Sequence, residues 1–156
     1  MPDAFFMMID QSAFEETQEV RTKTAILIAE DDPGDAFLIE NAFAKHGGDV
    51  RLEFVRDGRD VLRYLKREGP FTNGKKHPIP KILLLDLKLP VLDGFEVIER
   101  LRREKKFRDL TICVLTASID PGSMERAREL GADCCFIKPA STAEMAELVS
   151  ELLVYF

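Results

Sequence analysis

Four short apolar runs of this chain each lead into residues that could do chemistry. In chain order these residues are Glu30 and Asp31, Asp86, Thr116, and Lys138. Crowded carboxylates repel one another unless something neutralises them, and a hard divalent cation such as Mg²⁺ does so while taking only a few protein oxygens. Lysine adds a compact positive charge, and threonine adds a hydroxyl donor. The set therefore suits a carboxylate nucleophile that attacks phosphorus while metal and lysine neutralise the transferred group.

Each of these residues also has a simpler interpretation. A lone aspartate such as Asp86 often only ends a strand or opens a turn, and the others could be a solvated acid, a strand threonine and a surface lysine. Asp32 is better suited to cap a helix than to bind a metal, because Pro33 follows at a first helical position. The joint placement of the residues favours function, since parallel sheets build sites at the carboxyl ends of their strands.

The apolar runs themselves predict five strands. The run 82–85 is unbroken, which suits a strand buried on both faces of a parallel sheet. Residues 50–55 alternate apolar and charged side chains, which indicates a half-exposed strand at the sheet edge. The other three strands are expected at 25–29, 111–115 and 134–137.

Helical patterns separate these strands and follow the last one. Helices are expected after Asp32-Pro33, after Asp57-Gly58, after Asp93-Gly94, over residues 121–130, and after a Ser141-x-x-Glu144 capping box. Residues 69–80 are rich in glycine and proline and predict a loop. Five strands alternating with five helices predict an α/β fold in which a parallel sheet carries helices on both faces.

Composition restricts the partners and the location. The chain has 156 residues, about one domain, and its net charge of −6 argues against nucleic acid or an anionic membrane as main partner. The basic residues at 102–106 are interpreted as a solvated helix face. No apolar run approaches the ~20 residues of a membrane helix. Three cysteines without a C-x-x-C pair imply neither a disulfide framework nor a zinc site, and a reducing cytoplasm is the expected location.

Residues 1–23 are expected to be an extension that precedes a domain at 24–156. Apolar side chains gather in this extension: Phe5, Phe6, Met7, Met8, Ile9 and Phe14. They could pack on the domain or on a partner, or the extension could be a loosely ordered tail.

Four segments carry a combined motif: Ile-Ala-Glu-Asp-Asp-Pro at 28–33, Leu-Asp-Leu-Lys-Leu-Pro at 85–90 with Asp93-Gly94, Leu-Thr-Ala at 115–117, and Lys-Pro at 138–139. With these segments, roughly residues 24–155 resemble the receiver domains of two-component response regulators. The resemblance implies a flavodoxin-like, doubly wound (βα)5 fold and a single-domain response regulator of a phosphorelay. Such a protein is a signalling module that catalyses only its own phosphotransfer and dephosphorylation.

The resemblance also implies roles for individual residues. Asp86 would accept a phosphoryl group from a sensor histidine kinase in a Mg²⁺-dependent reaction, with Mn²⁺ as a substitute. The metal ligands would be Asp31, Asp86 and the backbone carbonyl of Lys88, with Glu30 acting through water. The phosphoryl oxygens would be held by Thr116, the Ala117 N–H and Lys138, with Pro139 directly after the lysine.

A narrower resemblance concerns partners. The long loop 69–80 and the absence of an output domain after Phe156 are similar to single-domain regulators that are paired with bacterial phytochromes. A bacteriophytochrome is therefore one expected kinase partner. If the protein forms a homodimer, the last strand, the last helix and the N-terminal extension are the surfaces expected to mediate it.

One position departs from the family pattern. Receivers usually present an aromatic switch residue three positions before the lysine, and here that position is Cys135. Phe136 is one step further along the strand, so its side chain would point to the opposite face. In receivers the threonine moves toward the phosphoryl group and the ring follows, so Cys135 argues against a ring-swing switch. Cys135 is expected to be a small packed side chain, and a redox sensor is the alternative.

Other functions are open alternatives. A metal-dependent phosphohydrolase of the haloacid-dehalogenase type would carry a second acid two residues after the nucleophile, where this chain has Lys88. A flavodoxin-like binding protein would need a Ser/Thr/Gly-rich phosphate loop after the first strand, where the acids at 30–32 would repel phosphate. A receiver fold kept purely as a scaffold would not need the intact set of acids, threonine and lysine.

Overall fold

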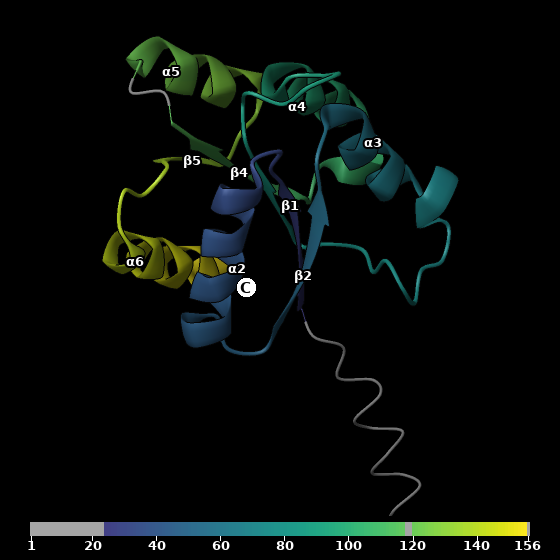
Figure 1. Ribbon diagram of the computed structural model, residues 1–156. Coiled ribbons are helices and arrows are strands. Elements are labelled where there is room, and N and C mark those ends of the chain that lie inside the picture. Colours follow the sequence, from purple (N-terminus) through teal and green to yellow (C-terminus); the bar gives the residue numbers. More distant parts are fainter. Residues whose placement is uncertain (1–23, 118–119, 156) are drawn as a thin grey trace, which may run out of the picture.

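The computed structural model describes residues 24–117 and 120–155, which contain one sheet of five parallel strands (Figure 1). The strands are β1 (Thr24–Ala29), β2 (Val50–Val55), β3 (Ile82–Leu85), β4 (Thr111–Thr116) and β5 (Cys134–Ile137). Their order in the sheet is β2-β1-β3-β4-β5, and neighbouring strands pair in parallel. The strand order reverses between β1 and β3, which makes their carboxyl ends the natural place for a site. The predicted doubly wound fold, with β2 at the edge, is confirmed.

Helices cover both faces of the sheet (Figure 1). One face carries α2 (Pro33–His46) and α6 (Thr142–Leu152), and the other carries α3 (Gly58–Lys66), α4 (Gly94–Arg103) and α5 (Pro121–Leu130). Short 3₁₀ helices follow α3, α4 and α6: η1 (Gly69–Phe71), η2 (Lys105–Phe107) and η3 (Leu153–Tyr155). Within the described residues the five α-helices are those predicted.

The core consists of two hydrophobic layers that the sheet separates. Ile82 and Leu84 of β3 belong to the layer under α2 and α6, whereas Leu83 and Leu85 belong to the layer under α3, α4 and α5. All four side chains are at most 1% exposed, because alternate strand residues point to opposite faces and helices cover both. Burying each side chain stabilises the fold by about 1.5–3 kcal/mol. The strand that leads into Asp86 is therefore held from both sides.

Polar side chains cap the helices where the chain leaves the sheet. Asp32 Oδ1 accepts hydrogen bonds from the N–H groups of Gly34 (2.7 Å) and Asp35 (3.1 Å), which confirms Asp32 as the N-cap of α2. The other α-helices are capped in the same way by Asp57, Asp93, Asp120 and Ser141. Since every helix of a βα unit starts at the carboxyl end of a strand, these caps collect at one edge of the sheet.

The loop 69–80, which the sequence predicts, is tied to the domain at two points. The hydroxyl of Tyr64 in α3 donates to the Pro78 carbonyl at 2.8 Å. The guanidinium of Arg51 in β2 donates to the Lys76 carbonyl at 2.6 Å. The loop therefore has a defined path along the side of α3.

Arg102 contradicts the interpretation of residues 102–106 as a solvated face. Its guanidinium donates to five acceptors: the carbonyl oxygens of Phe107 (2.8 Å), Leu110 (2.9 Å), Gly131 (2.9 Å) and Arg108 (3.5 Å), and the carboxylate of Asp133 (2.8 Å). These acceptors lie in the connections before β4 and β5, and the connection before β5 comes next to the end of α4 only in the folded chain. Arg103, its neighbour, does fit the expectation, because its side chain is 71% exposed and forms an ion pair with Glu99.

Cys113 and Cys134 form a disulfide, so the expectation that no disulfide is present was wrong. The two residues are register partners on β4 and β5, and their Cα atoms are 4.7 Å apart, within the range of disulfides. A separation of 21 residues carries no sign of pairing, because strand register is decided by the fold. Cys135 is free.

Some expectations concern residues that the structure does not describe. The extension of residues 1–23 lies outside the described residues, as do residues 118, 119 and 156. Among the helices within residues 24–117 and 120–155, none is long and apolar enough to cross a membrane.

Candidate functional site

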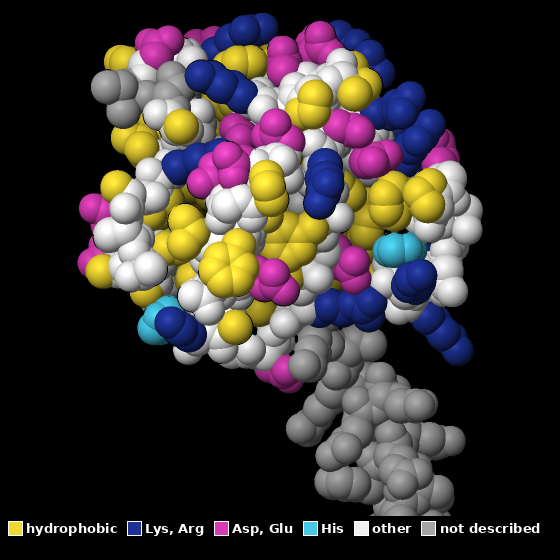
Figure 2. Space-filling model, in the orientation of Figure 1, with side chains coloured by type: hydrophobic (Ala, Val, Ile, Leu, Met, Phe, Trp, Pro, Cys, Tyr) yellow, Lys and Arg dark blue, Asp and Glu magenta, His cyan; other side chains and the backbone are white. Residues whose placement is uncertain are grey.

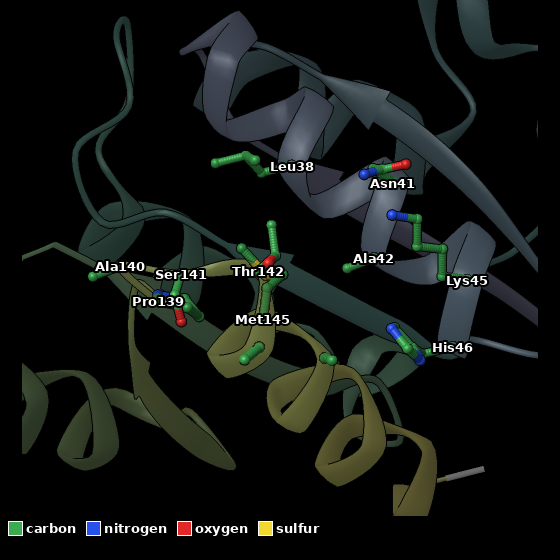
Figure 3. Close-up of a pocket in the computed structure, with 12 residues that line it drawn as sticks. Leu38, Asn41, Ala42, Lys45, His46, Pro139, Ala140, Ser141, Thr142 and Met145 are labelled. Atoms are coloured by element: carbon green, nitrogen blue, oxygen red, sulfur yellow. The ribbon is translucent and has the colours of Figure 1, made fainter.

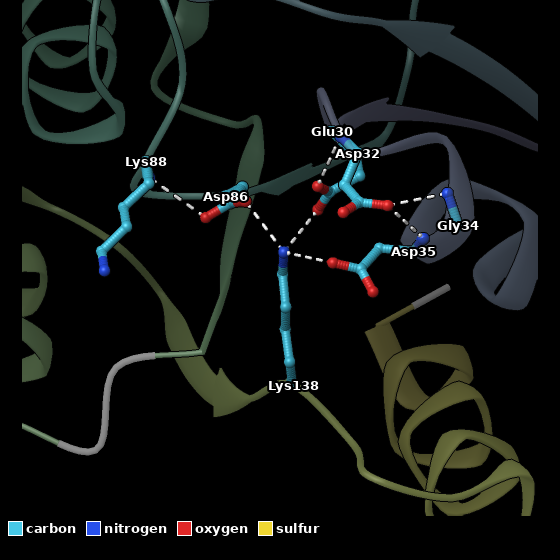
Figure 4. Close-up of polar contacts among 7 residues, drawn as sticks. All are labelled: Glu30, Asp32, Gly34, Asp35, Asp86, Lys88 and Lys138. Carbon is cyan, nitrogen blue, oxygen red and sulfur yellow. Dashed lines mark hydrogen bonds and ion pairs between the residues drawn. The ribbon is translucent and has the colours of Figure 1, made fainter.

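The ends of four strands bring the predicted chemistry-bearing residues to one edge of the sheet. Glu30, Asp86 and Thr116 follow or end β1, β3 and β4, and these residues are buried at 4%, 6% and 1% exposure. Lys138 follows β5 and points between the acids (Figure 4). Buried carboxylates are tolerated only when they are paired, and Lys138 is the cation that pairs with these acids.

Lys138 contacts three carboxylates at once (Figure 4). Its Nζ lies 2.9 Å from Glu30 Oε2, 2.9 Å from Asp35 Oδ2 and 2.9 Å from Asp86 Oδ2. Burial alone would lower the pKa of the ammonium group, but the hydrogen bonds to these acids outweigh burial and raise the pKa above its ordinary value. Lys138 therefore remains a fixed positive charge in the centre of the site.

Glu30 is the most deeply buried acid of the site. Burial raises its pKa to about 6, and the charge of Asp86 acts in the same direction, while the hydrogen bond from Lys138 opposes both. Its second oxygen, Oε1, accepts a hydrogen bond from the Asp32 N–H at 3.1 Å. Both oxygens are thus held in place by donors, and the side chain has a defined orientation toward Asp86.

The carboxylate of Asp86 is oriented by two donors. Its Oδ1 accepts from the backbone N–H of Lys88 at 3.0 Å, and its Oδ2 accepts from Lys138 at 2.9 Å. The turn after Asp86 is tight, because the Gly94 N–H donates to the Leu87 carbonyl at 2.9 Å and a Cβ on Gly94 would lie 2.7 Å from the Asp86 carbonyl. Glycine at this position is therefore what allows α4 to begin beside the site.

Glu30, Asp31 and Asp86 form an acidic cluster. One carboxylate oxygen from each lies within 4.8 Å of the others, with Asp31 exposed and the other two buried. Three carboxylates at this spacing, next to solvent, are the hard oxygen donors that Mg²⁺ and Mn²⁺ prefer. The residues therefore fit a divalent cation bound on the side of the cluster that Asp31 opens to water.

Comparison with known proteins assigns the chain to one family. The family model described as the response regulator receiver domain matches residues 26–150. The chain belongs to the receiver domain family. The resemblance drawn from its motifs is confirmed.

Three known proteins illustrate what this receiver is similar to. The receiver is 34% identical to the probable methanogenesis regulatory protein FilR2 of Methanothrix harundinacea, over 84% of this chain and 82% of FilR2. The phosphorylated cyanobacterial phytochrome response regulator RcpA matches with 28% identity and a TM-score of 0.76, over 84% of this chain and 91% of RcpA. The Mn²⁺-bound form of Rcp1 from Synechocystis matches with 26% identity and a TM-score of 0.73, over 83% of this chain and 91% of that chain.

Asp35 is the site residue of the receiver that sequence reasoning missed. It lies in the first turn of α2, and its carboxylate is the third partner of Lys138. Its N–H donates to the carboxylate of Asp32, the N-cap of α2, which holds Asp35 close to the end of β1. The available signal was weak, because an acid in the first turn of a helix is also favoured by the helix dipole alone.

Thr116, Ala117 and Pro139 complete the edge around Lys138. The Lys138 N–H donates to the Thr116 carbonyl at 2.7 Å, so the backbones of β4 and β5 stay paired up to the site. Ala117 is the exposed residue that follows β4. Pro139 follows Lys138 and lines a groove between α2 and α6.

Cys135 and Phe136 point to opposite faces of β5, as expected. Cys135 packs against the layer under α3, α4 and α5, whereas Phe136 packs against the layer under α2 and α6. Burial raises the pKa of the Cys135 thiol, an effect that the charge of Arg128 opposes, and its Sγ lies 3.7 Å from the Met124 carbonyl. No ring therefore stands at the usual switch position of this receiver.

Proposed function

We propose that this receiver is a single-domain response regulator in which Asp86 accepts a phosphoryl group from a sensor histidine kinase. The observation that carries the proposal is the bridge that Lys138 forms between Asp86 and Glu30. Asp31 lies at the same edge. The site thus supplies a nucleophilic carboxylate, a cation beside it and acids for a metal ion, which phosphoryl transfer to a carboxylate requires.

The transfer itself exchanges one bond to phosphorus for another. A carboxylate oxygen of Asp86 bonds to phosphorus while the bond to the kinase's histidine nitrogen breaks, and the electron pair of that bond stays with the histidine ring. The N–H of Lys88 and the ammonium of Lys138 hold the carboxylate in one orientation during this exchange. Orientation of the nucleophile is a large part of catalysis in such reactions.

A divalent cation fits the acidic cluster as a cofactor. We propose Mg²⁺, with Mn²⁺ as a substitute, held by Glu30, Asp31, Asp86 and the backbone carbonyl of Lys88. When bound, the ion neutralises negative charge on the phosphoryl oxygens. The Mn²⁺-bound form of the relative Rcp1 supports this assignment.

The remaining polar groups of the site receive the phosphoryl oxygens. The proposed donors are the Thr116 hydroxyl, the Ala117 N–H and the ammonium of Lys138. Lys138 can turn to a phosphoryl oxygen by releasing Asp35, the most exposed of its three acids, with a side chain that is 40% exposed. Releasing an exposed carboxylate costs little, because water replaces the lost contact.

The kinase is proposed to dock next to this edge, on α2 and α6. A groove of about 400 Å³ runs between the two helices and begins at Pro139, one residue after Lys138 (Figure 3). Phe37 and Leu38 on α2 are 65% and 40% exposed. Figure 2 shows hydrophobic side chains on the face that α2 presents to solvent. A partner that brings a phosphohistidine to Asp86 must cover a surface of this kind.

Replacing Leu38 by Asp tests this docking. Phosphotransfer from a cognate kinase should fall at least about tenfold, because a charge would be buried in the contact, whereas labelling by acetyl phosphate should not change. Equal losses with both phosphoryl donors would show that the substitution harms the site itself and would remove the docking proposal.

A sensor kinase of the phytochrome class is the proposed partner, because RcpA is a phytochrome response regulator. The proposed location is the cytoplasm, where such kinases present their histidine. The phosphorylated form is proposed to signal by protein–protein contacts, including a homodimer through β5 and α6. Because Cys135 replaces the ring, the signal would pass from Thr116 through α5, β5 and α6. Matching sedimentation profiles with and without a phosphoryl mimic would contradict the dimer.

A phosphohydrolase reaction is less consistent with the site. It would need a second acid two residues after Asp86, and Lys88 stands there with its side chain pointing away from the carboxylate (Figure 4). The proposed activity is therefore limited to the protein's own phosphorylation and dephosphorylation.

Mass spectrometry of the intact protein after incubation with acetyl phosphate tests the central proposal. We expect one phosphoryl adduct that depends on Mg²⁺ and is absent from Asp86→Asn. The control is Asp93→Asn, which changes the helix cap of α4 and leaves Asp86 intact. If the wild type gives no adduct with acetyl phosphate or with a cognate kinase, the fold serves as a scaffold and the proposal fails.

A further inference from the structure

A second concave surface lies at the opposite end of the sheet from Asp86. It is a groove of about 450 Å³ between the end of α3, the loop 69–80 and η2, and we call it the loop groove. Two of its residues, Lys81 and Leu110, directly precede β3 and β4. The loop groove therefore lies at the amino ends of the parallel strands.

The surface of the loop groove is largely apolar. Leu65, Phe107 and Leu110 line it, together with the prolines on either side of Ile79. Ile79 itself is 75% exposed, although the loop around it is tied down by the Tyr64 hydroxyl. A large aliphatic side chain that is exposed to solvent beside a groove indicates a surface that another segment covers.

The loop groove also carries an excess of positive charge. Arg67, Lys81 and Lys106 line it, against one acid, Asp109. Within residues 24–117 and 120–155, no carboxylate forms an ion pair with Arg67 or Lys81. Figure 2 shows basic side chains along the side of the molecule that α3 and the loop occupy. The groove thus fits an occupant that is both apolar and acidic.

Residues 1–20 of this chain have that composition. They contain five acids and no lysine or arginine, and they include the apolar run 5–9 and Phe14, followed directly by Glu15 and Glu16. An apolar run of this kind, left in water, would favour association between molecules. Charge and hydrophobicity are therefore complementary between this segment and the loop groove.

The first strand, β1, also begins close to the loop groove. The Lys81 N–H donates to the carbonyl of Ala25 at 2.9 Å, so the first residues of β1 lie beside the groove. Phe14 precedes Thr24 by ten residues, which can span about 33 Å when extended. The segment can therefore reach the whole groove without leaving its own molecule.

We propose that the N-terminal segment 1–20 docks into the loop groove of its own chain, with its phenylalanines on the apolar surface and its acids on Arg67, Lys81 and Lys106. The segment acts as an intramolecular cover for the amino end of the sheet. This proposal does not depend on phosphoryl transfer at the other end.

Carbodiimide cross-linking of the full-length protein tests the docking. An equal mixture of ¹⁴N- and ¹⁵N-labelled protein is treated with the reagent, and cross-linked peptides are identified by mass spectrometry. We expect links from Glu15, Glu16 or Glu19 to Lys81 or Lys106, each joining peptides of the same isotope. Mixed-isotope links would mean that a second copy occupies the groove, and absent links would mean that the groove is not occupied. Either result overturns the proposal.

A variant separates docking from mere proximity of a tethered tail. Phe5→Ser/Phe6→Ser keeps every acid, so a loosely tethered tail would cross-link as before. If the rings fill the groove, the yield of these links should fall more than about tenfold. An unchanged yield overturns the proposal.

Charge exchange gives a matched control. Lys81→Glu/Lys106→Glu should abolish the links, and adding Glu15→Lys/Glu16→Lys should restore links of inverted polarity. The same double acid-to-lysine change without the groove substitutions should lose the links from positions 15 and 16. Circular dichroism of each variant checks that the fold is retained, and failure of the combined variant to restore links contradicts the charge pairing.

Discussion

The two ends of the sheet differ in charge and in how that charge is satisfied. At the carboxyl end, Glu30, Asp35 and Asp86 surround a single lysine at 2.9 Å each, in a mostly buried site. At the amino end, the cations Arg67 and Lys81 line an open groove and form no ion pair within the part of the chain that the structure describes. One end is a compact chemical site, and the other is a surface.

The helices give a physical reason for this difference. In a parallel α/β sheet the helix N-termini lie at the carboxyl ends of the strands, where their partial positive charge favours acids. The helix C-termini lie at the opposite end and favour cations. The first turns of the helices contain Asp35, Asp60, Glu96 and Glu144, and the last turns contain Lys45, His46, Arg63, Lys66, Arg100, Arg102, Arg103 and Arg128. A metal-dependent phosphoryl site is therefore compatible with only one end of this sheet.

The largest expected effect is at the carboxyl end. Lys138→Met removes the charge that contacts all three acids, so the rate of labelling by acetyl phosphate should fall about 10²–10³-fold. The readout is the rate of adduct formation in intact-protein mass spectrometry. Lys88→Met is the matched control, because that side chain points away from Asp86, and its rate should be nearly unchanged. Similar losses in both variants would contradict a specific role for Lys138.

The disulfide links β4 and β5 between the two ends. Cutting it with a reductant should lower the free energy of unfolding by about 3 kcal/mol, because it closes a loop of 21 residues in the unfolded chain. Urea unfolding with and without reductant measures the change. Cys134→Ser should show no dependence on reductant, whereas Cys135→Ser should keep it. Identical unfolding midpoints for oxidised and reduced wild type would mean that the bond contributes nothing.

Arg102 should matter to stability and not to the site. Arg102→Met removes the five hydrogen bonds of the guanidinium, and the free energy of unfolding should fall by about 2–3 kcal/mol. Arg103→Met, next to it on an exposed pair, should change it by less than about 0.5 kcal/mol. Labelling of Asp86 should be normal in both variants. A loss of labelling in Arg102→Met would show that the two ends of the sheet are coupled.

The smallest effect concerns the free cysteine. Burial raises the pKa of the Cys135 thiol, so the thiol should be alkylated more slowly at neutral pH than a free thiol. The rate should continue to rise with pH beyond the ordinary thiol range, because only the thiolate reacts. Rapid alkylation at neutral pH would instead support Cys135 as a redox sensor.

Much of the fold could be predicted because its signals are local. The unbroken run 82–85, the alternation over 50–55 and the capping residues Asp32 and Ser141 each depend on a few neighbouring residues. Most of the candidate site could be predicted for a related reason. Once the strands are parallel, residues such as Asp86 and Lys138 must arrive at the same edge, whatever their separation in the chain.

The misses share a different cause. Asp35, Arg102 and the pair Cys113–Cys134 are ordinary in their local sequence: a first-turn acid, a helix-end arginine and two separated cysteines. Their roles depend on which segments become neighbours and at what register. No local pattern contains that information, because register is chosen by packing over the whole sheet.

By itself, the sequence determined the order of the elements, the parallel sheet and the residues at its reactive edge, since periodicity, caps and strand ends are properties of short segments. Only the tertiary structure decided that Lys138 bridges three acids, that Arg102 joins the connections before β4 and β5, and that Cys113 meets Cys134. It also decided that the end of α3, the loop 69–80 and η2 together form the cationic loop groove beside the start of β1. These features depend on distances of a few ångströms between residues far apart in the chain, and such distances exist only after the two core layers have packed.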